Sequence, residues 1–78
     1  MTKEFYYHQE DARSAAEQFA AGLSNPYISV GSVDDLTKFD YEDREARNLD
    51  WSGETSAFIV TGDDKDGNVD SGVFAYWE

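Results

Sequence analysis

The chain has 78 residues, of which 17 are Asp or Glu and six are Lys or Arg, so its formal net charge is −11. This length fits one domain, and the absence of cysteine excludes disulfides and cysteine-ligated metal sites. The negative charge disfavours direct binding to nucleic acid, because attraction to phosphates needs a cationic surface. No stretch approaches the roughly 18 apolar residues of a membrane span. The first residues also lack the apolar core of a secretory signal, so we expect a cytoplasmic protein without a membrane partner.

Aromatic residues make up 15% of the chain and recur from Phe5 to Trp77. This distribution predicts one folded domain over residues 1–78, because acidic disordered tails are poor in aromatic residues. Large rings bury much area per residue, which suits a small domain without a disulfide or a zinc site. The excess of negative charge opposes compaction through self-repulsion, so we expect stability to rise with added salt.

In chain order, the first predicted elements are a strand over residues 3–7 and a helix over residues 9–23. The strand is rich in aromatic residues. The helix carries apolar residues at helical spacing and acidic residues in its first turn, where carboxylates interact favourably with the helix dipole. Most of the apolar stripe is alanine, so we expect the helix to lie close against a sheet, with Phe19 and Leu23 as its larger anchors.

The sequence of residues 27–31 predicts a second strand, whereas that of residues 32–50 is consistent with several secondary structures. A short helix over residues 33–39 would turn its Leu and its Phe toward the core. A helical turn over residues 41–49 and a loop or edge strand near residues 46–51 are equally consistent with the sequence.

Residues 56–61 and 73–77 predict two strands that are joined by an acidic loop. The Asp-Gly pair at residues 66–67 favours a two-residue hairpin turn, because glycine tolerates a positive φ. That turn would place Asp63 opposite Asp70, a like-charge pair that destabilises the end of the sheet.

The order strand, helix, strand, variable segment and hairpin predicts a single α+β domain, in which one helix packs on an antiparallel β-sheet of three to five strands. The residues expected in the core are Phe19, Leu23, Ile28, Val30, Phe58, Val60 and Phe74. Both strands of the predicted hairpin are apolar on both faces, which suits the centre of a sheet. The alternative is that the C-terminal strand, residues 73–77, lies at a sheet edge. Such a strand tends to pair with another chain, so a homodimer through this hairpin is an alternative.

No motif in the chain predicts catalysis or metal binding. His8 is the only histidine, and no serine lies in a strand–turn–helix nucleophile motif. The acidic loop does not match an EF-hand, because Gly67 at position 6 would put Gly62 at position 1 and Val73 at position 12. We therefore expect no enzyme activity, no catalytic residue, no cofactor and no bound metal.

The most informative feature is the distribution of charge. Residues 34–50 hold seven acids and three bases, and residues 63–70 hold four Asp and one Lys. Closely spaced carboxylates can imitate a row of phosphates to a basic groove, and aromatic residues often anchor protein interfaces. The candidate partner-binding residues are Asp34, Asp35, Asp40, Tyr41, Glu42, Asp43, Glu45, Asp50, Trp51, Asp63, Asp64 and Asp66. A general acidic surface, which serves solubility or salt adaptation, is the alternative explanation.

In size, acidity and lack of cysteine the chain resembles the small inhibitors made by phages and mobile elements, such as anti-CRISPR proteins, anti-restriction proteins and the uracil-glycosylase inhibitor. The stretches that carry this likeness are DYEDREARNLD, residues 40–50, and GDDKDGNVD, residues 62–70. The resemblance implies a non-enzymatic inhibitor that occupies the basic nucleic-acid-binding surface of a bacterial defence complex in the host cytoplasm. A CRISPR effector is the favoured partner. The alternative is a small acidic structural or assembly module that dimerises through its C-terminal hairpin.

Overall fold

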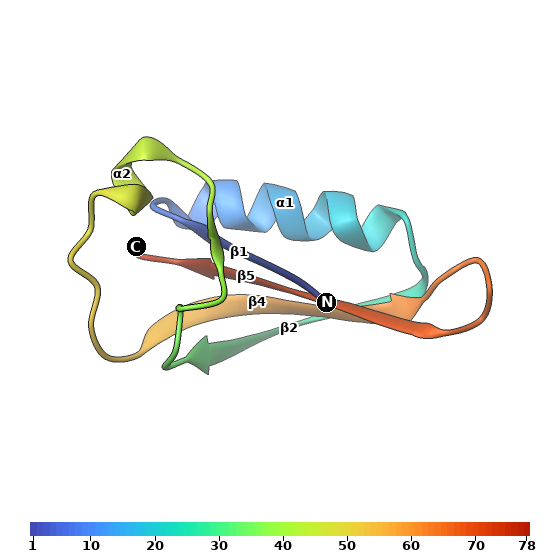
Figure 1. Ribbon diagram of the computed structural model, residues 1–78. Helices are drawn as coiled ribbons and strands as arrows, with labels where there is room; N and C mark the ends of the chain where they lie inside the picture. The colour runs from blue at the N-terminus through green and yellow to red at the C-terminus, as the bar shows by residue number, and fades with distance from the viewer.

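The chain forms five strands and two helices, described over residues 1–78 in a computed structural model. The elements are β1 (Thr2–Tyr6), α1 (Gln9–Ala21), β2 (Ser24–Val33), β3 (Asp40–Tyr41), α2 (Arg44–Arg47), β4 (Thr55–Asp63) and β5 (Val69–Tyr76). The strands form one sheet in the order β2-β4-β5-β1-β3, and α1 lies along one face of it (Figure 1). The predicted single α+β domain with one main helix is confirmed. Neither helix has the length and the apolar character needed to cross a membrane.

The five strands agree with the predicted number, but the prediction of an antiparallel sheet is wrong: the sheet is mixed, because β1 joins it by parallel pairing. β4 pairs antiparallel with both β2 and β5, whereas β1 pairs in parallel with β5 on one side and with β3 on the other. The N–H of Trp77 donates to the carbonyl of Tyr6 at 3.0 Å, which continues the β1–β5 ladder past the end of β5. The prediction that both hairpin strands lie inside the sheet is therefore confirmed, and the alternative that the C-terminal strand is a sheet edge is wrong, because β5 has a neighbour on each side.

The hairpin between β4 and β5 closes through a wider loop than the predicted two-residue turn. The N–H of Asp64 donates to the carbonyl of Asn68 at 2.8 Å, and Gly67 has a φ of 82°. Three loop residues followed by return to the ladder, with glycine in the left-handed region, are typical of a type I turn with a bulge. The extra residue shifts the register by one. Asp63 lies opposite Val69, so the like-charge pair predicted for Asp63 does not form.

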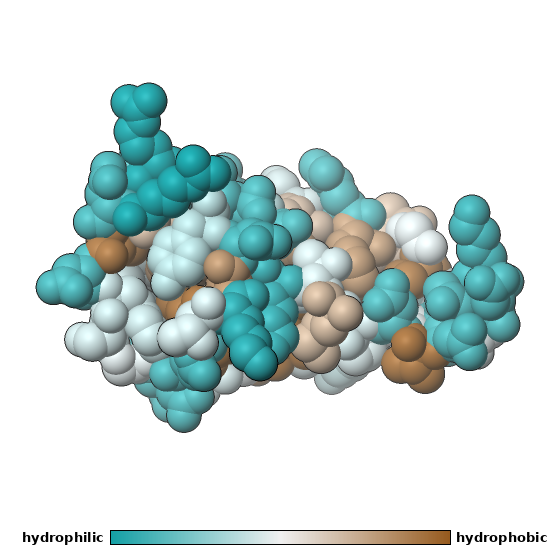
Figure 2. Space-filling model, in the orientation of Figure 1, coloured by the Kyte–Doolittle hydropathy of each residue, from teal (hydrophilic) through white to brown (hydrophobic).

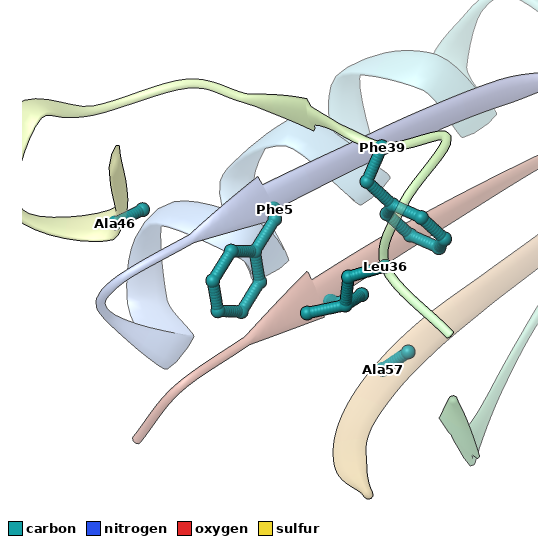
Figure 3. Close-up of a cluster of buried hydrophobic side chains, with 6 residues drawn as sticks. Phe5, Leu36, Phe39, Ala46 and Ala57 are labelled. Atoms are coloured by element: carbon teal, nitrogen blue, oxygen red, sulfur yellow. The ribbon is translucent and has the colours of Figure 1, made fainter. Parts of the chain in front are cut away.

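Buried side chains form one cluster on each face of the sheet. The cluster under α1 contains Ala12, Ala16, Ala20, Phe58, Val60 and Phe74. The cluster on the other face contains Phe5, Leu36, Phe39, Ala46, Ala57 and Ala75 (Figure 3). Because alternate residues of a strand face opposite sides, the central strands β4 and β5 contribute to both clusters.

The predicted core is correct for the central strands and wrong for β2. The expected core residues that are buried are Phe58, Val60 and Phe74. Phe19 and Leu23 are half-buried beside them. Val30 is 69% exposed and Ile28 is 40% exposed. Their cross-strand partners are buried under α1, but β2 is the edge strand, so the helix leaves the side chains of β2 largely uncovered.

The segment for which the sequence left several alternatives crosses the face of the sheet away from α1 and contains little regular structure. No helix forms over residues 33–39, where the carboxylate of Asp35 accepts the N–H of Thr37 at 3.0 Å and closes a turn. Further along, β3 adds two residues to the sheet, and α2 is a single turn. Asp43 caps α2, because its Oδ1 accepts the N–H of Ala46 at 2.7 Å.

Candidate functional site

The sheet edge formed by β1 and β3 brings together carboxylates that are far apart in the sequence. Glu4 and Asp40 are in register on neighbouring parallel strands. The N–H of Glu42 donates to the carbonyl of Phe5 at 3.0 Å, which extends the same ladder. Since alternate residues of a strand share a face, Glu4, Asp40 and Glu42 lie together on one side of this edge. We name these three residues the acidic edge.

Two groups at this edge, Glu42 and the neighbouring Tyr6, have a raised pKa. The pKa of Glu42 is raised first by partial burial and then by the negative charges of Glu4 and Asp40, whereas the positive charge of Arg47 lowers it. Burial also raises the pKa of Tyr6, whose hydroxyl donates to the Glu4 carboxylate at 2.7 Å. The ionised carboxylates therefore repel one another in the folded chain, and a cationic partner would relieve this repulsion.

Three of the candidate carboxylates hold local structure. Asp43 caps α2 through Oδ1 and accepts the N–H of Tyr7 through Oδ2 at 3.0 Å. Asp35 accepts the N–H and the hydroxyl of Thr37, and these two hydrogen bonds lower its pKa. Asp64 Oδ1 accepts two backbone N–H groups of the hairpin loop at 2.8 and 2.9 Å. These residues shape the chain around the acidic clusters as well as adding charge to them.

The two candidate aromatic anchors pack against the buried cluster on the face away from α1. Tyr41 lies edge-on to Phe5, with 5.1 Å between the ring centroids. Trp51 packs against the same cluster, and its indole N–H is buried without a hydrogen-bond partner. Both rings are half-buried and help to hold the segment between β2 and β4 on the sheet. The most exposed aromatic ring is instead that of Tyr27 in β2, which is 68% exposed.

The two acidic stretches lie at opposite ends of an elongated molecule, whose extents are 39 × 19 × 18 Å. β4 has nine residues, so its ends lie about 26 Å apart at the usual strand rise. Hydrophilic side chains gather at the α2 end and again at the β4–β5 hairpin (Figure 2). The fold therefore does not join the hairpin carboxylates, Asp63, Asp64 and Asp66, to those of residues 34–50. The other exposed candidates, at the α2 end, are Asp34, Glu45 and Asp50.

Glu4 is not among the candidate residues predicted from the sequence, although the acidic edge is incomplete without it. In a local count of charge, Glu4 cancels Lys3. Strand alternation separates the two on opposite faces, and Lys3 Nζ lies 5.8 Å from the ring centroid of Phe39. That alternation is a signal that could have been used. The pairing that brings Glu4 beside Asp40 joins residues far apart in the chain, and no local pattern predicts it.

A shallow surface depression lies near the start of α1. It is lined by His8, Gln9, Glu10 and Glu78. The imidazole of His8 packs edge-on against the Tyr7 ring, with 4.9 Å between the centroids. The lining offers a base and carboxylates but no serine, cysteine or lysine side chain. No group of three or more His, Asp or Glu side chains is placed to hold a metal ion.

Comparisons with protein-family models, with curated proteins and with solved structures gave no match.

Proposed function

We propose that this chain is a non-enzymatic, anti-CRISPR-like inhibitor that acts in the cytoplasm of a bacterial host. In this proposal the acidic edge occupies a basic, nucleic-acid-binding surface of a bacterial defence complex, and a CRISPR effector is the favoured partner. The supporting observation is the clustering of Glu4, Asp40 and Glu42 at one sheet edge, where burial and then the charges of the other two carboxylates raise the pKa of Glu42. A surface that serves solubility alone is better made with charges of both signs interspersed, whereas clustered carboxylates match clustered cations.

The shape of the molecule supports the same proposal. Its 39 Å length corresponds to about 11 base pairs of B-DNA at a rise of roughly 3.4 Å per pair. A groove that is lined by Lys and Arg to hold phosphates also attracts a compact body with a net charge of −11. Such attraction acts at long range and weakens as salt is added.

Competition with DNA tests this function. A labelled target duplex is bound to each of several purified CRISPR effector complexes, and the protein is then added at increasing concentration. We expect at least one effector to release its DNA. We also expect the half-inhibitory concentration to rise at least tenfold between about 50 and 200 mM salt, because several charge pairs form together. The proposal would be contradicted if none of the effectors released its DNA, or if the displacement did not depend on salt.

Paired charge reversals test whether the acidic edge is the binding surface. Asp40→Lys with Glu42→Lys changes the net charge by four at the acidic edge. Asp63→Lys with Asp66→Lys makes the same change at the hairpin and serves as the control. We expect the first variant to inhibit at least tenfold more weakly, because like charges would then meet across the interface. The control should stay within threefold of the wild type. Equal losses in the two variants would show that net charge, and not the acidic edge, determines binding.

A further inference from the structure

Over residues 27–33, β2 is an open sheet edge without the charges or proline by which natural sheets protect their edges. Pro26 and the register irregularity between Ser24 and Tyr27 protect only the start of the strand. Residues 27–33 contain no charged residue and no proline, and the only neighbour of β2 in the sheet is β4. About half of the N–H and C=O groups in this stretch point away from β4, since an antiparallel neighbour pairs with alternate residues. The opposite edge, β3, is protected in the usual way, because it has two residues and begins with Asp40.

Apolar side chains are exposed on both faces of β2. Val30 and Ile28, on the face that carries α1, are 69% and 40% exposed. Tyr27, on the other face, is 68% exposed. In Figure 1, β2 lies at the border of the sheet, away from α1. A strand added beside β2 would therefore cover side chains on both faces while pairing with its free backbone groups.

The charges at the two ends of β2 select the occupant. Asp34 and Asp35 follow Val33 directly at one end, and Asp63 lies opposite Ser24 at the other end. A second copy of the chain, paired antiparallel, would bring an Asp34–Asp35 end against an Asp63 end at both ends of the interface. These like charges oppose self-pairing. A peptide with an uncharged middle and basic residues at both ends has the complementary pattern.

We propose that β2 is the docking edge for an extended segment of a partner protein, which adds to the sheet as a further strand and carries Lys or Arg at both ends of an uncharged stretch. Main-chain hydrogen bonds would supply affinity, and the exposed side chains of β2 would supply specificity. The docking edge and the acidic edge lie at opposite borders of the sheet. This inference therefore goes beyond the inhibitor function and does not depend on it.

A designed peptide tests the docking edge directly. The probe is the fluorescent peptide KKTVTVTVTKK, and its binding to the full chain is measured by fluorescence anisotropy. We expect saturable binding and, on hydrogen exchange, new amide protection within residues 27–33. In the control peptide, two adjacent central residues carry N-methyl groups. Because neighbouring N–H groups point to opposite sides of a strand, this peptide cannot form the central hydrogen bonds on either of its sides, and it should bind at least tenfold more weakly. EETVTVTVTEE should bind at least tenfold more weakly because its ends carry the wrong charge. Equal affinity of the N-methylated peptide would overturn the proposal, since charge alone would then account for binding.

Two matched substitutions locate the binding surface on the protein. Val30→Lys places a charge in the middle of the docking edge, and Val69→Lys makes the same change in β5, two strands away. Both positions are exposed, at 69% and 77%, so both variants should fold. We expect Val30→Lys to weaken peptide binding at least tenfold and Val69→Lys to change it less than threefold. Equal affinities of the two variants would refute the assignment.

Two further measurements separate the docking edge from its alternatives. The Asp40→Lys, Glu42→Lys variant should keep its peptide affinity within threefold, whereas Val30→Lys should keep its ability to compete with DNA. These two measurements therefore show separately whether the inhibitor function or the docking edge fails. Sedimentation of the chain alone should show a monomer. A dimer that Val30→Lys abolishes would show that a second copy occupies the edge, and would overturn the proposed occupant.

Discussion

Replacement of Leu36 by alanine should destabilise the whole domain, although Leu36 lies outside every helix and strand. Its side chain is 0% exposed and packs in one cluster with Phe5, Phe39 and Ala57 (Figure 3). Because no regular hydrogen-bond ladder holds this part of the chain, burial of Leu36 is a main reason that the segment stays on the sheet.

The expected loss follows from the atoms removed and the space they leave. Leu36→Ala removes three carbon atoms, which at about 0.8 kcal/mol each amounts to about 2.4 kcal/mol of transfer free energy. A void of roughly 50 Å³, at about 24 cal/mol per Å³, adds about 1.2 kcal/mol, since strands on one side and rings on the other limit collapse. The loss of about 3–4 kcal/mol is a large share of the roughly 4–12 kcal/mol expected for a domain of this size.

Urea unfolding at pH 7, followed by far-ultraviolet circular dichroism, measures this loss. At a slope of about 1 kcal/mol per M, the midpoint should fall by roughly 3 M. Val30→Ala is the matched control. Val30 is 69% exposed, so its truncation should cost less than about 1 kcal/mol. A loss below about 1 kcal/mol for Leu36→Ala, or equal losses in the two variants, would refute the packing described for this segment.

Four further predictions address the caps, the charges and the close packing. Asp43→Ala should cost about 1–2 kcal/mol in urea unfolding because α2 loses its cap, whereas Glu45→Ala, exposed on the same turn, should change stability little; equal effects would contradict the capping role. Glu42→Gln should raise the melting temperature at pH 7, because the raised pKa of Glu42 means that its ionised form weakens the fold. The gain should disappear as the pH falls below 4.5, the ordinary pKa of this carboxyl, and a gain that is constant with pH would contradict this reasoning. Gly72→Ala should cost about 1–3 kcal/mol in thermal unfolding, since the new Cβ would lie 2.8 Å from Cε2 of Phe74; an unchanged melting temperature would show that the ring moves freely. The melting temperature of the wild type should rise with NaCl as screening weakens self-repulsion, and a flat or falling curve would exclude that repulsion as a limit on stability.

The sequence by itself determined most of the local elements. Alanines at helical spacing predict α1, and runs of aromatic and β-branched residues predict β1, β2, β4 and β5, because both periodicities are properties of neighbouring residues. The predicted register of the hairpin was wrong by one residue. The Asp-Gly pair favoured a two-residue turn, but the side chain of Asp64 accepts two loop N–H groups and supports a wider loop.

Only the tertiary structure decided which residues are covered. Strand order depends on pairings between distant parts of the chain, and these place β5 inside the sheet and β2 at its edge. Val30 has the pattern of a core residue but lies beyond the cover of α1, so it is exposed. Leu36 lies in a segment without a clear period, yet it is buried because that segment crosses the open face of the sheet.

The candidate site divides in the same way. The net charge of −11 and the density of acids in residues 34–50 follow from the sequence alone. The sequence alone does not show which carboxylates act together, because electrostatic interaction weakens with distance in space and not with separation along the chain. Parallel pairing of β1 with β3 brings Glu4 beside Asp40, while the length of β4 carries Asp63 to the other end of the molecule.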